Sequence, residues 1–234
     1  MGVEDFYEYR RLIGRPYTSD GPAYDPTARD PDAWENANRR FVQLVDVWFH
    51  QPLTEAGFRG KAPRWVFGRG AVRPVLDVQR HPGAQLEEGL TDFTVNWAIW
   101  VEGFARQVSR AKRLTPQTAQ APYQGRIGQL MGKGEYDVWW AVTPERVVRH
   151  MPPRAEPDPP SASDEVPELL RTRLIPMLTP VDTVAATVDA IERWQAAGWG
   201  SLMHWWEDPL DALRAIAGGQ PEDPPSASKE PTRE

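Results

Sequence analysis

The sequence predicts an α+β fold, in which a four-stranded antiparallel sheet carries a long N-terminal helix and C-terminal helices packed on one face. Three observations favour this class. Apolar side chains alternate without a break over residues 93–101, which is the period of a strand with one buried face. Over residues 34–49 apolar side chains recur at three- and four-residue steps, which indicates an amphipathic helix. Further helix-start signals with apolar runs follow residue 164.

The first helix is predicted to begin at Asp30-Pro31, with Asp30 as the N-cap and Pro31 in the first helical position. Pro52 should kink this helix or end its regular hydrogen bonding. Gly57 is a natural cap for the C-terminal end. We expect residues 1–30 to form an irregular N-terminal arm that lies outside the folded domain.

Four strands are predicted at residues 64–68, 72–79, 93–101 and 136–142. The short connections between the first strands favour antiparallel neighbours. Pro74 indicates that the second strand is edge-like near its start, because proline donates no hydrogen bond to a sheet. Residues 103–134 are harder to assign. A short basic helix from Phe104 to Leu114 and an irregular excursion both fit that part, and glycines make its end loop-like.

The remaining chain is predicted to be helical, with polar linkers. Thr143-Pro144 indicates a helical turn through Val148. Proline, aspartate and serine dominate residues 152–163, which we expect to be a flexible spacer. Helices are then expected after Asp164, after a capped start at residues 179–182, and after Asp208. The folded unit is therefore a single domain over residues 31–218, followed by a disordered tail at residues 219–234.

Composition excludes several classes of function. The 234 residues include no cysteine, which excludes disulfide frameworks, thiolate zinc sites and cysteine nucleophiles. The N-terminus has no apolar run typical of a signal peptide, and no stretch approaches the roughly 20 apolar residues of a membrane span. We therefore expect a cytoplasmic protein with no membrane partner.

Charge is distributed unevenly along the chain. The net charge is −6, but residues 59–133 contain 12 basic and 5 acidic side chains, a local charge of +7. Such a segment can mark a surface that binds polyanions. The favoured interpretation is internal complementarity between the basic centre and the acidic ends, because nucleic-acid-binding domains show a more strongly clustered basic footprint.

Several short motifs together resemble a known family. They occur in a fixed order between helices: Leu53-x-x-x-Gly57-Phe58, a strand ending in Gln79, Phe93-Thr-Val-Asn96, Arg126-Ile-Gly128 and Asp137-x-Trp139-Trp140. Over about residues 39–200 the chain resembles the bacterial family catalogued as the domain of unknown function DUF4304. The resemblance implies a small α+β domain in a soluble bacterial protein. Since the family has no assigned activity, it implies no catalytic residue.

The residues themselves indicate no catalytic group, cofactor or metal. The four histidines lie far apart in sequence, without the spacing of metal ligands. No Gly-x-Ser-x-Gly motif is present, and the glycines around Lys133 do not form a phosphate-binding loop. Whether the protein is an enzyme is left open by the sequence, and a non-enzymatic role is favoured.

Five candidate binding residues stand out because they place polar or aromatic groups within or beside apolar strands: Gln79, Asn96, Trp100, Arg126 and Trp139. On one interpretation they form a concave polar and aromatic patch that binds a partner or a ligand. On the other, Asn96 and Gln79 satisfy backbone groups, Arg126 holds a loop in place, and Trp139 belongs to the core.

Three hypotheses of function follow. The first is a non-enzymatic domain that binds a protein partner, in the manner of an immunity protein, which rests on analogy between folds. The second is a small-ligand-binding domain or enzyme with a pocket near Asn96, Arg126 and Trp139. The third, which is least favoured, is nucleic-acid binding through the basic segment 103–134. The sequence does not predict the identity of the partner or the oligomeric state.

Overall fold

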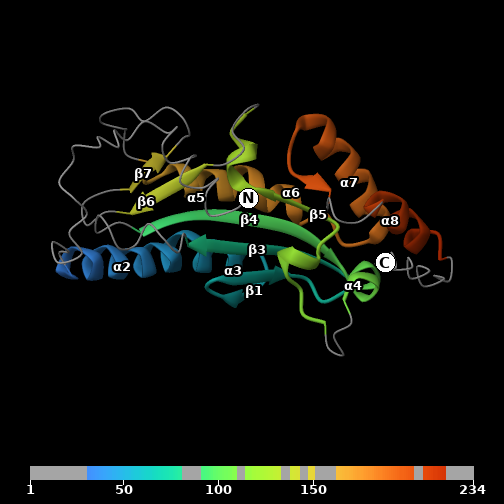
Figure 1. The fold of residues 1–234 in the computed structure, drawn as a ribbon, viewed down its shortest axis with the longest axis horizontal. Coiled ribbons are helices and arrows are strands. Elements are labelled where there is room, and N and C mark those ends of the chain that lie inside the picture. Colours follow the sequence, from blue (N-terminus) through green and yellow to red (C-terminus); the bar gives the residue numbers. More distant parts are fainter. Residues whose placement is uncertain are drawn as a thin grey trace, which may run out of the picture.

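The computed structural model describes residues 31–80, 91–109, 114–132, 138–142, 147–150, 162–202 and 208–219. In this part of the chain an antiparallel sheet runs through the molecule, with helices along it (Figure 1). The predicted arm at residues 1–30, most of the predicted spacer and the tail beyond residue 219 lie outside the described residues.

The sheet is larger than the sequence predicted. Six strands follow one another in the order β1-β2-β3-β4-β5-β8, and a pair formed by β6 and β7 joins the sheet at β4. All of these pairings are antiparallel. The α+β class and the antiparallel sheet are thus confirmed, whereas the prediction of four strands is wrong. The strands are β1 (Phe58–Lys61), β2 (Arg64–Phe67), β3 (Val72–Arg80), β4 (Thr91–Val101), β5 (Tyr123–Arg126), β6 (Trp139–Val142), β7 (Val147–His150) and β8 (Ser201–Leu202).

Strand β4 is the axis of the sheet, because three other strands pair with it. On one edge β3 pairs with it from Phe93 to Val101. On the other edge β5 pairs with residues 96–99, and β6 pairs with residues 91–93. Between them, at Thr94 and Val95, neither strand is paired with this edge of β4. We call this place the fork, since the two neighbouring strands diverge there.

Pro74, which has no backbone N–H to donate, lies in the part of β3 that has a strand partner on one side only. Strand β2 pairs with β3 only at Val75, Leu76 and Asp77, so residues 72–74 have a strand partner on the β4 side alone. The predicted edge-like start of this strand is therefore confirmed.

The N-terminal helical run comprises three segments: α2 (Pro31–Val45), the π-helical turn η1 (Asp46–His50) and α3 (Gln51–Glu55). Gln51 donates its backbone N–H to the Asp46 carbonyl, five residues back. The wider turn precedes Pro52, whose ring nitrogen has no N–H to continue the regular α-helical pattern. The predicted interruption at Pro52 is confirmed, and Gly57 follows the helix with a φ of 91°.

The C-terminal helices also contain a π-helical turn just before a proline. The π-helical turn η4 ends at Leu174, and Ile175 donates to the Leu170 carbonyl immediately before Pro176. The cap of α7 is Thr183, which lies just beyond the predicted start at residues 179–182, and Asp208 caps α8 as predicted. The helices that follow β4 in the described chain are α4 (Glu102–Val108), η2 (Thr118–Gln120), η3 (Ile127–Leu130), α5 (Glu165–Leu169), η4 (Leu170–Leu174), α6 (Ile175–Leu178), α7 (Val184–Ala197) and α8 (Pro209–Ala217).

Two local predictions are wrong. Val147 and Val148 belong to β7, where the sequence predicted a helical turn, because they pair with β6. The glycine-rich end of the basic segment contains β5 and η3, where the sequence predicted a loop. Of the alternatives for its beginning, the short helix is confirmed as α4.

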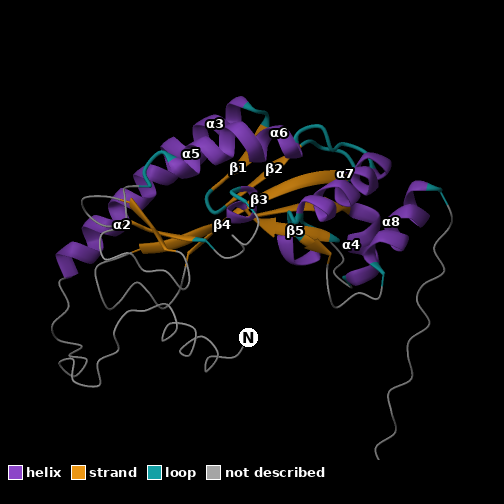
Figure 2. Ribbon diagram, turned by 90° about the horizontal axis from the view of Figure 1, so that it is seen from above, coloured by secondary structure: helices purple, strands orange, loops and turns teal. Residues whose placement is uncertain are grey.

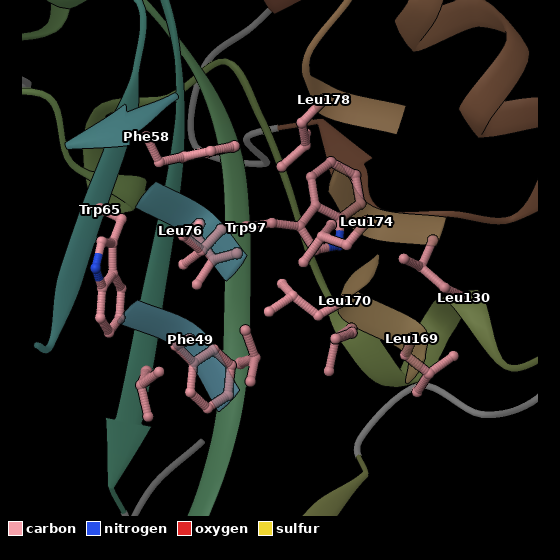
Figure 3. Close-up of a cluster of buried hydrophobic side chains, with 14 of the residues drawn as sticks. Phe49, Phe58, Trp65, Leu76, Trp97, Leu130, Leu169, Leu170, Leu174 and Leu178 are labelled. Carbon is pink, nitrogen blue, oxygen red and sulfur yellow. The ribbon is translucent and has the colours of Figure 1, made fainter. Parts of the chain in front are cut away.

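Helices α2, α3, α5 and α6 lie along one face of the sheet (Figure 2). The core lies between them and the alternating side chains of β4, all of which are at most 1% exposed. Figure 3 shows Trp97 of β4 between the residues of the N-terminal helical run and those of η4 and α6. Trp97 packs edge-on against Trp194 of α7, with 5.5 Å between ring centroids, and lies 5.9 Å from Tyr123 of β5.

Titration of Tyr123 makes the free energy of unfolding depend on pH. The ring is fully buried, and the hydroxyl donates a hydrogen bond to the Trp199 carbonyl. Burial raises the pKa of Tyr123 above its ordinary value of 10.0. The folded state therefore keeps this proton at a pH where the unfolded chain loses it, so the free energy of unfolding falls as the pH rises above 10.0.

Tyr123→Phe is expected to be less stable than the wild-type chain by about 1 kcal/mol at neutral pH, because the Trp199 carbonyl loses its donor. The difference should shrink above about pH 10, since phenylalanine has no proton to lose. Urea denaturation followed by circular dichroism at a series of pH values between about 8 and 11 measures both effects. Parallel pH profiles for the two proteins would contradict the assignment.

Candidate functional site

The sheet face opposite the helices brings four of the predicted binding residues together around the fork. Gln79 comes from β3, Asn96 from β4, Arg126 from the end of β5 and Trp139 from the start of β6. Asn96 is directly opposite Arg126 in the β4–β5 register. We call these four residues the fork patch.

Two contacts define the fork patch. The amide nitrogen Nδ2 of Asn96 donates to Oε1 of Gln79 at 2.7 Å, across the β3–β4 pair. The guanidinium carbon of Arg126 lies 5.2 Å from the ring centroid of Trp139, which is the geometry of a cation–π contact. Gln79 is exposed, and the other three side chains are half-buried. The patch thus presents amide groups, a cation and an aromatic face side by side.

Neighbouring residues fix the positions of Arg126 and Trp139. The backbone N–H of Arg126 donates to Oε1 of Gln129 at 2.7 Å, which closes the first turn of η3. Before Trp139, the carbonyl of Val138 accepts a hydrogen bond of 2.9 Å from the buried hydroxyl of Thr94. Thr94 lies at the fork, where no strand pairs with this edge of β4, so its hydroxyl anchors the start of β6 in place of a backbone ladder.

Trp100 does not belong to this patch. Its side chain is 1% exposed and packs with Val75 and Ala105 in a small cluster separate from the main core. The guanidinium of Arg73 lies 5.1 Å from its ring centroid. Trp100 shares a sheet face with Asn96 but is buried among its own neighbours, so the structure brings together four of the five predicted residues.

Asp77 is a neighbour of the patch that the sequence did not single out. It lies opposite Asn96 in the β3–β4 register and is 8% exposed. Arg64 donates hydrogen bonds to both carboxylate oxygens of Asp77, from Nε to Oδ1 at 2.6 Å and from Nη2 to Oδ2 at 3.3 Å. The hydroxyl of Thr118 donates to Oδ2 at 3.0 Å. The only signal for this cluster is a carboxylate within the apolar run of β3, since its partners come from distant parts of the chain.

The polar groups of this face are largely engaged with one another. The Asp77 carboxylate is already engaged by a guanidinium and a hydroxyl, and the fork patch offers amides, a cation and an aromatic ring. Within the described ranges, no group of three histidine, aspartate or glutamate side chains is placed to hold a metal ion. The helices that the structure describes include none that is long and apolar enough to cross a membrane.

The predicted basic segment 103–134 is described only in part. Arg106 lies on α4 and pairs with Glu102, four residues earlier, whereas Arg126 ends β5 and stacks on Trp139. The other basic side chains of this segment, Arg110, Lys112, Arg113 and Lys133, lie outside the described residues. In the part that is described, the two arginines belong to separate elements and each engages a neighbour.

Comparison with known proteins adds one finding. Nothing among the curated proteins or the solved structures matches the chain. The model of the family DUF4304, a domain of unknown function, matches residues 49–151, which run from η1 to the end of β7 and include the whole fork patch. Residues 49–151 are therefore identified as a DUF4304-like domain, which confirms the resemblance predicted from the sequence over a shorter span than residues 39–200.

Proposed function

We propose that the chain is a non-enzymatic binding domain that engages a protein partner through the fork patch. The observation that carries this proposal is the Arg126 guanidinium stacked on the half-buried Trp139 ring, beside the Asn96–Gln79 amide pair. Arginine and tryptophan are enriched among the residues that dominate the binding energy of protein interfaces. The patch lies on the sheet face opposite α2, α3, α5 and α6 (Figure 2).

The patch also indicates what the partner presents. Asn96 and Gln79 use one donor and one acceptor on each other, which leaves the Gln79 nitrogen and the Asn96 oxygen for another molecule. A donor and an acceptor side by side match a peptide group. The partner segment is therefore peptide backbone. A toxin neutralised by this chain is the form of partner that an immunity-type role requires.

Arg126→Ala and Trp139→Ala are each expected to weaken the complex by about 2 kcal/mol, roughly a thirtyfold loss of affinity, because they remove the cation and the aromatic face of the patch. To test this, the tagged chain is incubated with an extract of the source cell, and the proteins that it retains are identified by mass spectrometry. Calorimetry with the purified partner then measures the affinity of each variant. The identified partner should bind through exposed peptide backbone, and proline substitution in that segment, which removes a backbone N–H, should reproduce the loss.

Arg171→Ala in η4 and Trp199→Ala after the end of α7 are matched controls, since they remove the same residue types from positions outside the fork patch. Both should bind the partner as the wild-type chain does. The proposal fails if the patch variants and these controls bind equally well, with circular dichroism melting curves showing that all four are folded. It also fails if no reproducible partner is recovered.

A small-ligand-binding domain or enzyme is the second candidate. It is favoured by the contact between Arg126 and Trp139 and by the pairing of Asn96 with Arg126, which place the three predicted pocket residues together. Thermal-shift screening against small carboxylates and nucleotides tests it. A shift that Trp139→Ala removes and Trp199→Ala retains would favour this candidate over protein binding.

A further inference from the structure

A concave region lies away from the fork patch, between the C-terminal helices. It is a groove of about 520 Å³, which falls within the range of small-molecule sites. Its floor consists of side chains that are at most 5% exposed: Leu130, Val181 and Trp194. Half-buried Met177 and Trp199 form its walls, and exposed polar side chains stand at its rim, among them Arg173, Asp189 and Arg193. An apolar floor with a few polar groups at the mouth is the usual anatomy of a ligand site.

The end of α7 places the two tryptophans of the groove. Gly198 has a φ of 76°, and its N–H donates to the Gln195 carbonyl, while the N–H of Trp199 donates to the Trp194 carbonyl at 2.8 Å. These two bonds form a Schellman motif, which turns the chain back on the helix and brings the residue after the glycine against the last turn. The carbonyl of Trp199 also accepts from the Tyr123 hydroxyl. Trp199 is thus held at both of its backbone groups.

The rim of the groove is more basic than the chain as a whole. The chain carries a net charge of −6, yet the groove is lined by two arginines and one aspartate. Arg173 donates from Nη1 to the carbonyl of Leu130, which holds its guanidinium at the rim. Arg193 is exposed on α7, one residue before the buried Trp194. A cation beside an aromatic surface complements a ligand that is both planar and negatively charged.

We propose that this groove binds a small planar aromatic anion, a carboxylate or sulfonate, with its ring against Trp194 and Trp199 and its charge at Arg193. The site goes beyond the proposed function, because none of the fork patch residues lines the groove. The two proposed sites therefore share no side chain.

The test uses two fluorescent probes with the same ring system and the full chain. Anilinonaphthalene sulfonate carries the anion, and N-phenylnaphthylamine is its uncharged analogue. Arg193→Gln is expected to weaken the sulfonate by about tenfold, because a charge-assisted contact is lost, and to leave the uncharged probe unchanged within about twofold. Trp199→Ala should weaken both probes by about tenfold, since both lose the aromatic wall.

Arg171→Gln is the matched control, an exposed arginine on η4 that does not line the groove, and Trp139→Ala is the control at the fork patch. Both should bind the sulfonate as the wild-type chain does. The proposal is overturned if the wild-type chain binds no sulfonate, if Arg193→Gln and Arg171→Gln bind it equally, or if Trp139→Ala abolishes the binding. Far-UV circular dichroism establishes that each variant is folded, and Arg193→Gln, at an exposed position, decides the outcome if Trp199→Ala does not fold.

Discussion

Trp97→Ala should lower the free energy of unfolding by about 4 kcal/mol, a large share of the stability of a domain of this size. Trp97 is fully buried at the centre of β4 and lies 5.5 Å from Trp194 and 5.9 Å from Tyr123. Figure 3 shows its ring among the leucines of η4 and α6. Removing the ring leaves a cavity where the sheet, α6 and α7 meet, and the surrounding elements close it only in part.

Urea denaturation followed by circular dichroism measures this loss, and two variants calibrate it. Trp97→Phe should cost much less, about 1 to 2 kcal/mol, because it keeps an aromatic ring and the indole nitrogen has no hydrogen-bond partner among the described residues. Trp139→Ala removes the same residue type from a half-buried position and should cost about 1 kcal/mol. If Trp97→Ala were no less stable than Trp139→Ala, Trp97 would not be the centre of the core.

Gly200→Ala should cost about 3 kcal/mol, because two independent effects add at this position. The φ of Gly200 is 80°, in the left-handed region that disfavours a side chain. A Cβ atom there would also lie 2.7 Å from the Gln124 carbonyl and 2.9 Å from the ring of Trp97. Neither neighbour has room to move, since Gln124 pairs with β8 and Trp97 is buried.

Gly198→Ala separates the two effects. Its φ of 76° is nearly the same, but nothing lies within 4 Å of the position that its Cβ would take. This variant should therefore lose only the backbone contribution, about 1 kcal/mol. Equal losses for the two variants in urea denaturation would show that the contact with β5 and Trp97 contributes nothing.

The sequence predicts an element well when the signal lies within that element. The alternation of β4, the cap at Asp208 and the interruption at Pro52 follow from local chemistry, whereas the cap of α7 is Thr183, one residue beyond the predicted start. The sequence does not predict strand β5, because Gly125 indicates a loop. The structure shows why glycine is there: a Cβ atom would lie 2.5 Å from the buried Trp97 ring. Pro144 misled the prediction for β7 in a similar way, because pairing with β6 outweighs the local signal.

The candidate site follows the same division. Asn96 stands out in the sequence as a polar residue within an apolar strand, and the structure places Gln79, Arg126 and Trp139 near it. Trp100 was grouped with them because it shares their strand face, but alternation along a strand does not reveal what covers each position. Neither the Asp77 cluster nor the groove can be predicted from the sequence, since the residues of each come from segments that are far apart in the chain.

The fork divides one edge of β4 between β5 and the β6–β7 pair. Pairing with β4 at residues 91–93, the bond from the Thr94 hydroxyl to the Val138 carbonyl, and contacts of Glu165 with Trp140 and Arg149 hold the β6–β7 pair in place. Trp139 and Arg126, which are in contact, therefore come from separately paired strands. A partner that contacts both residues, as proposed, would bridge the two strands across the fork, so it is expected to slow amide hydrogen exchange in β6 and β7.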